Sequence, residues 1–210
     1  MPADGLRLVF ADDALVVIDK PAGLLAVAGR GADKHDCAAV RVQRLFADAL
    51  IVHRLDQATS GLLAFGRGAA AQRALSRAFA ERRVHKRYDA VVTGLVADDE
   101  GRIDLPLAAD WPNRPRQKVD PERGRPSSTR WRVIARDVHA GTTRLALEPL
   151  TGRSHQLRVH LAAIGHPIAG DALYAPQGLA AQRLLLHAAA LTLPHPADGR
   201  VSSFEAPVPF

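Results

Sequence analysis

The sequence predicts an α+β fold built on a largely antiparallel β-sheet, and short apolar segments carry that prediction. Most of them are rich in β-branched or aliphatic residues and are bounded by Gly, Pro or Asp, as strands and their turns are. Few segments have helical spacing, so strands are expected to outnumber helices. Hydrophobic residues make up 47% of the 210 residues, which is enough for a continuous core.

The expected extended segments run from the N-terminal to the C-terminal end of the chain: Leu6–Phe10, Ala14–Asp19, Ile51-Val52, Gly61–Phe65, Lys86–Gly94, Ser128–Ala135, Thr143–Pro149, Leu184–Leu193 and Val201–Glu205. Between Ile103 and Val119 the chain is rich in Pro, Asn and Arg. We expect a long functional loop there rather than a packed element. No internal repeat or linker interrupts the pattern, which favours one domain over residues 1–210.

Three segments are expected to form helices: Asp36–Phe46, Ala69–Arg83 and Leu157–Ile164. The second has the clearest amphipathic pattern. Its shared face is expected to consist of Ala71, Leu75, Ala78, Phe79 and Arg82. The third helix is expected to stop at Gly165 and Pro167, because glycine and proline interrupt helices.

Composition limits the class of protein without identifying it. Lys and Arg exceed Asp and Glu, giving a formal net charge of +6. This excess suits a polyanionic partner, although a generally basic proteome explains it equally well. The single cysteine, Cys37, excludes an internal disulfide framework and fits a reducing cytosol. Because neither a secretory signal nor an apolar run of about 20 residues is visible, we expect a cytoplasmic protein with no membrane segment.

The loop His53–Ser60 contains the residues best suited to chemistry, with Arg54 and Asp56 between two apolar segments. A lone Asp in such a loop is usually a turn residue, because its carboxylate hydrogen-bonds nearby backbone amides. A carboxylate between apolar strands is, however, expected to be partly buried and to need a partner. The basic cluster Arg153–Arg158 offers one, since arginine can hold a carboxylate with two parallel hydrogen bonds.

Two other segments combine aromatic and basic residues. Lys86-Arg87-Tyr88 opens an expected strand, and alternation places Lys86, Tyr88 and Ala90 on one face. A tyrosine there could stack on a base or move a proton, or it could be an ordinary half-buried strand residue. The segment Trp111–Lys118 suits a nucleic-acid surface, but a solvated loop explains such charge more often.

Several familiar chemistries have no support in the sequence. It contains neither a phosphate-binding glycine loop nor Gly-x-Ser-x-Gly. Nine histidines raise the question of a metal, but His155 and His160 are five residues apart and would face different sides of a helix. We therefore expect hydrogen-bonded structural or RNA-contacting roles for His155, His160, His166 and His187.

A series of ordered motifs resembles those of the RluA family of RNA pseudouridine synthases. The most specific is His53-Arg54-Leu55-Asp56-Gln57-Ala58-Thr59-Ser60-Gly61-Leu62-Leu63. It is followed, in the family's order, by Lys86-Arg87-Tyr88, Thr151–His160, Gly165–Asp171 and Leu185–Ala188. The resemblance covers nearly the whole chain, from Asp19–Leu24 to Phe204–Pro207.

The resemblance implies an isomerase that converts uridine to pseudouridine in structured RNA without a metal, redox cofactor or nucleotide. It also implies the pseudouridine synthase catalytic fold, a mixed, mainly antiparallel bent β-sheet flanked by helices and loops, here without an S4 domain. Asp56 would be the catalytic aspartate, Tyr88 the active-site tyrosine and Arg158 the partner that forms a salt bridge with Asp56. The residues expected to contact RNA are Arg54, His53, Thr59, Arg114, Arg116, Lys118, Arg153, His155 and Gln156.

The segment Trp111–Val119 narrows the resemblance to a subgroup that modifies a 23S rRNA hairpin and the tRNA anticodon stem-loop. One or both RNAs are the expected partners of a protein expected to be monomeric. The uridine has to be flipped out of the RNA before its N1–C1′ bond can be exchanged for a C5–C1′ bond. Asp56 could attack C1′, attack the uracil ring or act as a base at the sugar, while Tyr88 or water could remove the C5 proton.

Two other classes of function use some of the same residues. A non-catalytic RNA-binding protein would need the basic residues but not a buried carboxylate facing phosphates. A glycosidase acting on nucleosides would need a second catalytic acid. Asp89, Glu148 and Asp171 are candidates for that acid, but none of them stands in a motif comparable with that of Asp56.

Overall fold

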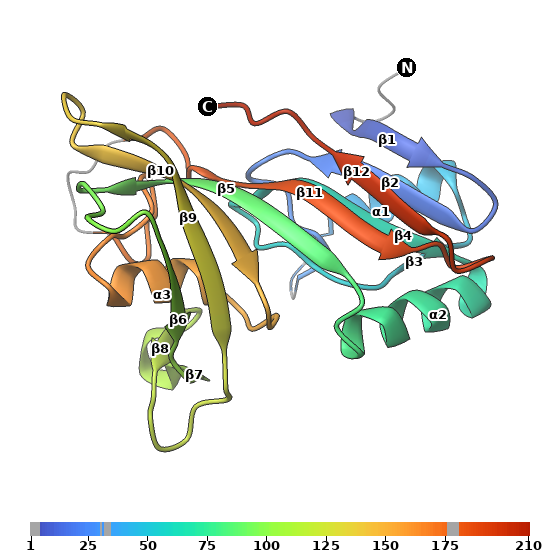
Figure 1. The fold of residues 1–210 in the computed structure, drawn as a ribbon. Helices are drawn as coiled ribbons and strands as arrows, with labels where there is room; N and C mark the ends of the chain where they lie inside the picture. Colours follow the sequence, from blue (N-terminus) through green and yellow to red (C-terminus); the bar gives the residue numbers. More distant parts are fainter. Residues whose placement is uncertain (1–4, 30, 32–34, 176–180) are drawn as a thin grey trace. The chain divides into compact units, whose positions relative to one another are not determined.

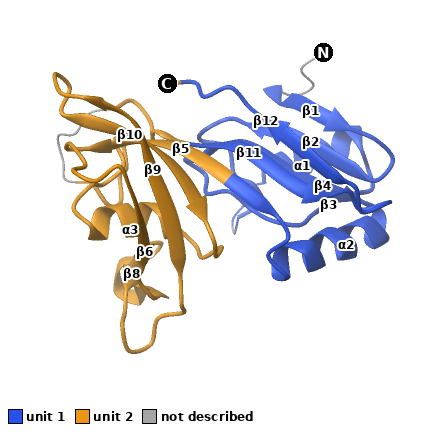
Figure 2. Ribbon diagram, viewed as in Figure 1, with its two compact units in different colours: residues 1–86, 187–209 blue, residues 87–186, 210 orange. Residues whose placement is uncertain are grey.

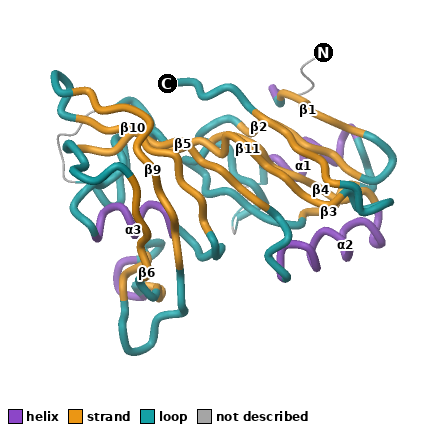
Figure 3. Tube along the Cα trace, viewed as in Figure 1, coloured by secondary structure: helices purple, strands orange, loops and turns teal. Residues whose placement is uncertain are grey.

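The computed structural model describes residues 5–29, 31, 35–175 and 181–210, and most of its regular structure is strand (Figures 1 and 3). The described chain divides into two compact units, which Figure 2 colours separately. Unit 1 combines the chain up to Lys86 with His187–Pro209, and unit 2 consists of Arg87–Leu186 and Phe210. In both units the strands are mainly antiparallel, which confirms the predicted α+β class.

Unit 1 contains a mixed sheet. Its strands are β1 (Arg7–Ala11), β2 (Leu15–Lys20), β3 (Ala49–Ile51), β4 (Ser60–Arg67), β11 (Leu186–Pro194) and β12 (Val201–Glu205). They lie in the order β1-β2-β4-β11-β12, and β3 also pairs with β4. The pairs β1–β2, β2–β4, β3–β4 and β11–β12 are antiparallel, whereas β4 and β11 form a short parallel pair.

Local chemistry explains where these strands begin. The Asp12 carboxylate accepts the backbone N–H groups of Ala14 at 2.9 Å and Leu15 at 2.8 Å, which turns the chain from β1 into β2. At the start of β4, Gly61 has a φ of +112°, and a Cβ there would lie 2.4 Å from the Ala188 carbonyl oxygen. Only glycine allows β11 to approach β4 at this point.

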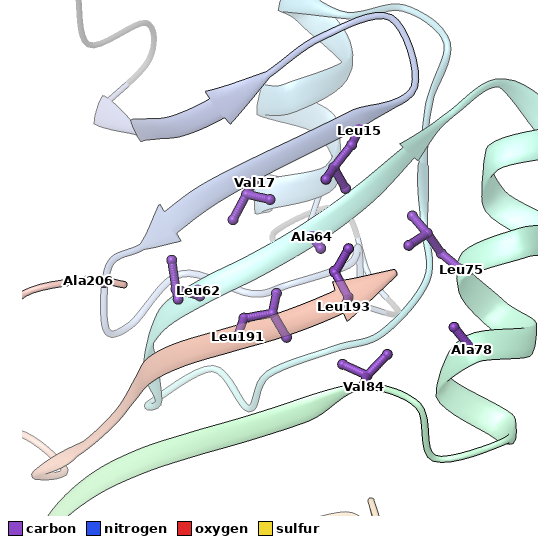
Figure 4. Packing of buried hydrophobic residues seen from close by; sticks show 10 residues of the cluster. All are labelled: Leu15, Val17, Leu62, Ala64, Leu75, Ala78, Val84, Leu191, Leu193 and Ala206. Atoms are coloured by element: carbon purple, nitrogen blue, oxygen red, sulfur yellow. The ribbon is translucent and has the colours of Figure 1, made fainter. Parts of the chain in front are cut away.

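The core of unit 1 lies where helix α2 (Gly68–Ala80) packs against β4 (Figure 4). The helix contributes Ala71, Leu75 and Ala78, which the sequence pattern assigned to its inner face. The buried cluster consists of Leu15, Val17, Leu62, Ala64, Leu75, Ala78, Val84, Leu191, Leu193 and Ala206. Helix α1 (Ala38–Leu45) has only Ala38 and Val42 buried and falls within the predicted segment.

The predicted end of α2 was wrong by one turn. The helix stops at Ala80, and Arg82 adopts a φ of +58° outside it rather than lying on its inner face. The N–H groups of Arg82 and Arg83 donate to the carbonyls of Phe79 at 3.2 Å and Ala78 at 2.9 Å. This is a Schellman motif, in which a left-handed residue satisfies the last carbonyls of a helix. Arginine has good helix propensity, so composition alone did not indicate the stop.

Unit 2 contains an antiparallel sheet in the order β5-β10-β9-β6. The strands are β5 (His85–Thr93), β6 (Glu100–Asp104), β9 (Ser128–Asp137) and β10 (Thr142–Pro149), and β5 starts within unit 1. Helix α3 (Gln156–Ala163) packs against β10 and against the short strand β8 (Gln117–Val119). Leu145 and Leu147 of β10 are fully buried, and they alternate with half-buried residues along the strand.

The expectation of an unpacked loop between Ile103 and Val119 was also wrong. The segment contains the end of β6, a hairpin of β7 (Leu107–Ala109) and β8 (Gln117–Val119), and a single turn at Trp111–Asn113. Ile103 and Leu107 are each only 4% exposed. These strands are too short for a period of two to emerge, and the intervening prolines concealed them.

Candidate active site

The loop that carries Asp56 is fastened to the turn after β2. The Lys20 side chain is fully buried, and its ammonium donates to the carbonyls of Pro21 at 2.9 Å, Leu24 at 2.8 Å and Gln57 at 3.2 Å. Gln57 is also joined to Gly23, whose N–H donates to the Gln57 carbonyl at 2.8 Å. A buried ammonium is tolerated because these carbonyls replace water around it. The residue next to Asp56 is therefore held at a fixed place.

His53 fastens the other end of the same loop. On one edge of β4, pairing with β3 ends at Phe65 and pairing with β11 covers Ser60 and Gly61. Between them, the Ala64 N–H donates to Nε2 of His53 at 3.0 Å, so a side chain completes the strand edge. The ring stacks on Phe79 at 4.6 Å. Burial, with a smaller effect of Lys86, lowers the pKa of His53 to about 3, which keeps the ring neutral.

Between these two attachments, Asp56 is half-buried and Arg54 is exposed. Leu55, only 5% exposed, anchors the loop in the interior. The Thr59 N–H donates to the Asp56 backbone carbonyl at 3.1 Å, which forms a turn. The side-chain carboxylate of Asp56 takes no part in this backbone hydrogen bond. Asp56 is therefore partly buried, as expected, and it lies in a loop whose two ends are held by hydrogen bonds.

Tyr88 lies in β5, where it is half-buried and pairs across the sheet with Leu147. Its neighbours in the alternation, Lys86 and Ala90, are half-buried and buried, whereas His85 and Arg87 are exposed. The predicted common face of Lys86, Tyr88 and Ala90 is therefore correct. Burial lowers the pKa of Lys86.

Arg158 lies in α3 and is almost completely enclosed. Its Nε and one terminal nitrogen donate to the two carboxylate oxygens of Asp171, at 2.8 and 2.7 Å. The side chains of Arg158 and Asp171 are 6% and 0% exposed. The sequence motifs implied Arg158 as the salt-bridge partner of Asp56 and did not indicate this pairing with Asp171.

Other candidate carboxylates of unit 2 also have arginine neighbours. Glu148 lies 3.5 Å from Arg130, and Asp89 lies 3.9 Å from Arg87. Asp171 lies in the buried pair described above. A glycosidase of the usual kind needs a second carboxylic acid beside its first carboxylate. Each of these three carboxylates has a cationic neighbour, and none stands in a motif comparable with that of Asp56.

The residues expected to contact RNA differ widely in exposure. Arg54, Arg114, Arg116 and Lys118 are exposed, His53, Arg153 and His155 are half-buried, and Thr59 and Gln156 are buried. Gln156 is fully engaged within unit 2, since its amide donates to Ser128 and Thr129 and its oxygen accepts from Thr151 and Arg153. Burial of this kind favours a structural role for Gln156 and Thr59 over direct contact with RNA.

The histidines singled out by the sequence are hydrogen-bonded. His160 lies between Thr129 and the Leu105 carbonyl, both at 3.0 Å, and burial lowers its pKa. His166 contacts the Thr93 carbonyl, and His187 contacts Ser60. Among the described residues, no group of three His, Cys, Asp or Glu side chains could hold a metal ion.

A model of the RNA pseudouridylate synthase family matches residues 14–163, which is most of the chain. The chain belongs to the RNA pseudouridylate synthase family. The protein is therefore an isomerase that acts on uridine in RNA, as the ordered motifs implied. The match includes Asp56, Tyr88 and Arg158 but ends before Asp171.

Curated bacterial relatives are similar to this pseudouridine synthase along nearly its whole length. The Escherichia coli strain K12 protein named dual-specificity RNA pseudouridine synthase RluA is 49% identical over 207 residues, covering 98% of this chain and 94% of its own. The protein of the same name from Vibrio vulnificus strain CMCP6 is 48% identical over 210 residues, covering 97% of this chain and 84% of its own.

Solved structures agree with the fold of this pseudouridine synthase. Human RNA Pseudouridylate Synthase Domain Containing 1 has a TM-score of 0.82 at 29% identity, covering 98% of this chain and 84% of that chain. Human RNA Pseudouridylate Synthase Domain Containing 4 has a TM-score of 0.77 at 24% identity, and its likeness bears on the fold alone. The pseudouridine synthase fold expected from the sequence is thereby confirmed.

Two residues of the enzyme were missed as functional candidates. Asp171 ends one of the ordered motifs, but the only role the sequence suggested for it was that of an unsupported second acid, and nothing in the sequence pointed to Tyr174. The Tyr174 hydroxyl lies 2.7 Å from Nδ1 of His155, and its ring lies 5.1 Å from the Arg158 guanidinium carbon. The available signal was Gly170-Asp171, since a glycine before a buried acid indicates a turn built to place it.

Within the described residues, no helix of the enzyme is long and apolar enough to cross a membrane.

Proposed function

We propose that this enzyme isomerises specific uridines in structured RNA, with a 23S rRNA hairpin, the tRNA anticodon stem-loop or both as substrates, and with Asp56 as the catalytic carboxylate. The observation that carries the proposal is the fastening of the Asp56 loop by buried Lys20 on one side and His53 on the other. A group that reacts with a flipped nucleotide has to be held in position before the nucleotide arrives. The dual-specificity name of the relatives at 48–49% identity supports two classes of substrate.

The proposed reaction exchanges one glycosidic bond for another within the same nucleotide. The N1–C1′ bond breaks, uracil turns, the C5–C1′ bond forms, C5 loses its proton and N1 gains one. An ionised Asp56 can attack C1′, attack the uracil ring or remove a proton from the sugar. All three routes require the nucleotide to be flipped out of its stack, which costs a few kcal/mol.

Arg158 and Tyr88 complete the proposed catalytic set. A guanidinium paired with the Asp56 carboxylate orients that carboxylate in the active enzyme. Tyr88 can stack on the flipped uracil or exchange the C5 proton through its hydroxyl. The Tyr88→Phe variant separates these roles, because the ring alone suffices for stacking and not for proton transfer.

The proposed RNA contacts are the exposed basic residues. Arg54 is next but one to Asp56 and is suited to fill the space that the flipped nucleotide leaves. Arg114, Arg116 and Lys118 are exposed near Trp111, whose ring is 67% exposed and lies 3.4 Å from the Arg114 guanidinium carbon. Phosphates attract such cations, and an exposed aromatic ring can stack on a base.

We further propose that both units work as one catalytic domain, in a cytoplasmic monomer that needs no cofactor. The family model supports this view, because its match to residues 14–163 runs through both units.

The experiment that tests the reaction class uses RNA transcripts carrying uridine tritiated at C5. A pseudouridine synthase releases tritium to water and leaves the base attached to the RNA. A glycosidase would release free uracil instead, and a binding protein would release neither. Tritium release without uracil is the expected result, and either alternative pattern would overturn the proposal.

A further inference from the structure

We propose that Asp171 is a positioning residue for the reaction: it holds the Arg158 guanidinium in place before RNA binds. This inference rests on the proposed role of Arg158 beside Asp56. Asp171 neither contacts the reacting atoms in this account nor acts as a second acid. Its effect on the reaction passes through Arg158 alone.

The geometry of the pair carries the first step of the argument. Asp171 accepts from Nε at 2.8 Å and from one terminal nitrogen at 2.7 Å, so it takes the side edge of the guanidinium. Arginine has five N–H groups in a rigid plane, and two parallel hydrogen bonds fix that plane. The end edge, formed by the two terminal nitrogens, therefore points in one direction. That edge is the one suited to a second carboxylate.

Asp171 is itself fixed by the backbone around it. Its Oδ1 accepts the N–H groups of Leu173 at 2.9 Å and Tyr174 at 3.2 Å, in addition to the arginine. Gly170 before it has a φ of +74°, and a Cβ there would lie 1.9 Å from the Arg183 carbonyl oxygen. Only glycine permits this turn. These backbone hydrogen bonds hold the Asp171 carboxylate in one position.

Tyr174 also contacts the Arg158 guanidinium. Its ring lies 5.1 Å from the Arg158 guanidinium carbon, where a cation is attracted to an aromatic face. Its hydroxyl accepts the Gln117 N–H at 2.7 Å and pairs with Nδ1 of His155, also at 2.7 Å. Tyr174 therefore links the Arg158–Asp171 pair to His155, directly before α3, and to Gln117 in β8.

We expect the Arg158–Asp171 pair to affect the rate of the chemical step more than the affinity for RNA. A buried charge pair is costly to assemble, and replacing it by apolar residues is often neutral or stabilising. Its presence at 6% and 0% side-chain exposure is explained if it orients a group that acts later. An arginine side chain loses rotamer entropy when it is ordered, and Asp171 brings about that ordering before the transition state instead of during it.

The test measures single-turnover tritium release at saturating RNA, together with the RNA dissociation constant. For Asp171→Asn we expect the rate to fall by about 10- to 100-fold, because a displaced catalytic partner slows chemistry. RNA affinity should change by less than about threefold, since binding to phosphates does not depend on this pair. In the Arg158→Lys background, Asp171→Asn should have little further effect, because Asp171 acts through Arg158.

Asp12→Asn is the matched control. The Asp12 carboxylate also accepts two backbone N–H groups and contacts a basic side chain, His195, at 2.9 Å. It lies in the turn between β1 and β2 and is not among the residues proposed to act in the reaction. Both substitutions should lower the unfolding temperature, but only Asp171→Asn should slow tritium release in folded enzyme.

A second measurement covers the case in which Asp171→Asn does not fold. In RNA-free wild-type enzyme, the Nε–H resonance of Arg158, assigned by its loss in Arg158→Lys, should exchange slowly with water. Rapid exchange would show that the guanidinium is not held, and it would overturn the inference. So would a wild-type rate in Asp171→Asn, or equal additive losses in the two arginine backgrounds. A wild-type enzyme that releases no tritium would instead overturn the proposed function.

Discussion

Arg158 is buried together with its partner, so its removal should affect stability as well as the reaction. Arg158→Ala leaves the Asp171 carboxylate uncompensated at 0% side-chain exposure. Breaking one side of a buried pair typically costs about 3–5 kcal/mol. We expect a loss of that size in the free energy of unfolding measured with urea, together with loss of tritium release.

The matched variant for this prediction is Arg200→Ala. Arg200 pairs with Asp198 at 2.7 Å, and the Arg200 side chain is 85% exposed. Exposed ion pairs contribute about 0–1 kcal/mol, so this variant should stay near wild-type stability. Equal effects of the two substitutions would mean that burial of the Arg158–Asp171 pair has no energetic consequence.

At the scale of elements, the loop His53–Ser60 links the pH dependence of stability to the position of Asp56. The pKa of His53 is about 3 in the folded protein, below its ordinary value of 6.5. As the pH falls below 6.5, the unfolded chain takes up a proton first, so folding stability is lost between pH 6.5 and about 3. The slope from this residue approaches about 1.4 kcal/mol per pH unit.

His53→Gln tests that dependence. Glutamine can still accept the Ala64 N–H, but it does not titrate. Urea unfolding at pH 7, 6 and 5 should therefore show a flatter loss of stability in the variant than in the wild type. Parallel curves would contradict the neutral, buried state of the His53 ring.

The end of helix α2 offers a second prediction at this scale. Arg82 has a φ of +58°, a conformation that is unfavourable for residues with a Cβ and accessible to glycine. Arg82→Gly should therefore raise the free energy of unfolding by about 0.5–1 kcal/mol. Arg73→Gly, at an exposed position inside the same helix, should lower it by about 1 kcal/mol. Destabilisation by both substitutions would contradict the Schellman end of α2.

At the scale of the whole molecule, sequence patterns predicted the elements whose spacing is local. The strand Val201–Glu205 has the predicted bounds, and the inner face of α2 contains the predicted Ala71, Leu75 and Ala78. Such patterns succeed because burial repeats along one element. They failed at Arg82 and between Ile103 and Val119, where a backbone conformation or pairing with distant chain decides the outcome.

The same distinction applies to the candidate site. The motif around Asp56 could be read directly, since its residues are adjacent in the chain. The fastening of its loop by Lys20 and the pairing of Arg158 with Asp171 join residues from separate motifs. Spacing gives no measure of such contacts. The sequence therefore indicated the candidate site residues, but it did not indicate the contacts that hold them in place.

The measurement that tests the central claim most directly is tritium release by Asp56→Asn beside its RNA affinity. Asparagine keeps the size of the side chain and cannot supply an ionised carboxylate. We expect release to fall to background, while the RNA dissociation constant stays within about threefold of wild type because the exposed basic residues remain. Release at a substantial fraction of the wild-type rate would contradict the assignment of Asp56 as the catalytic carboxylate.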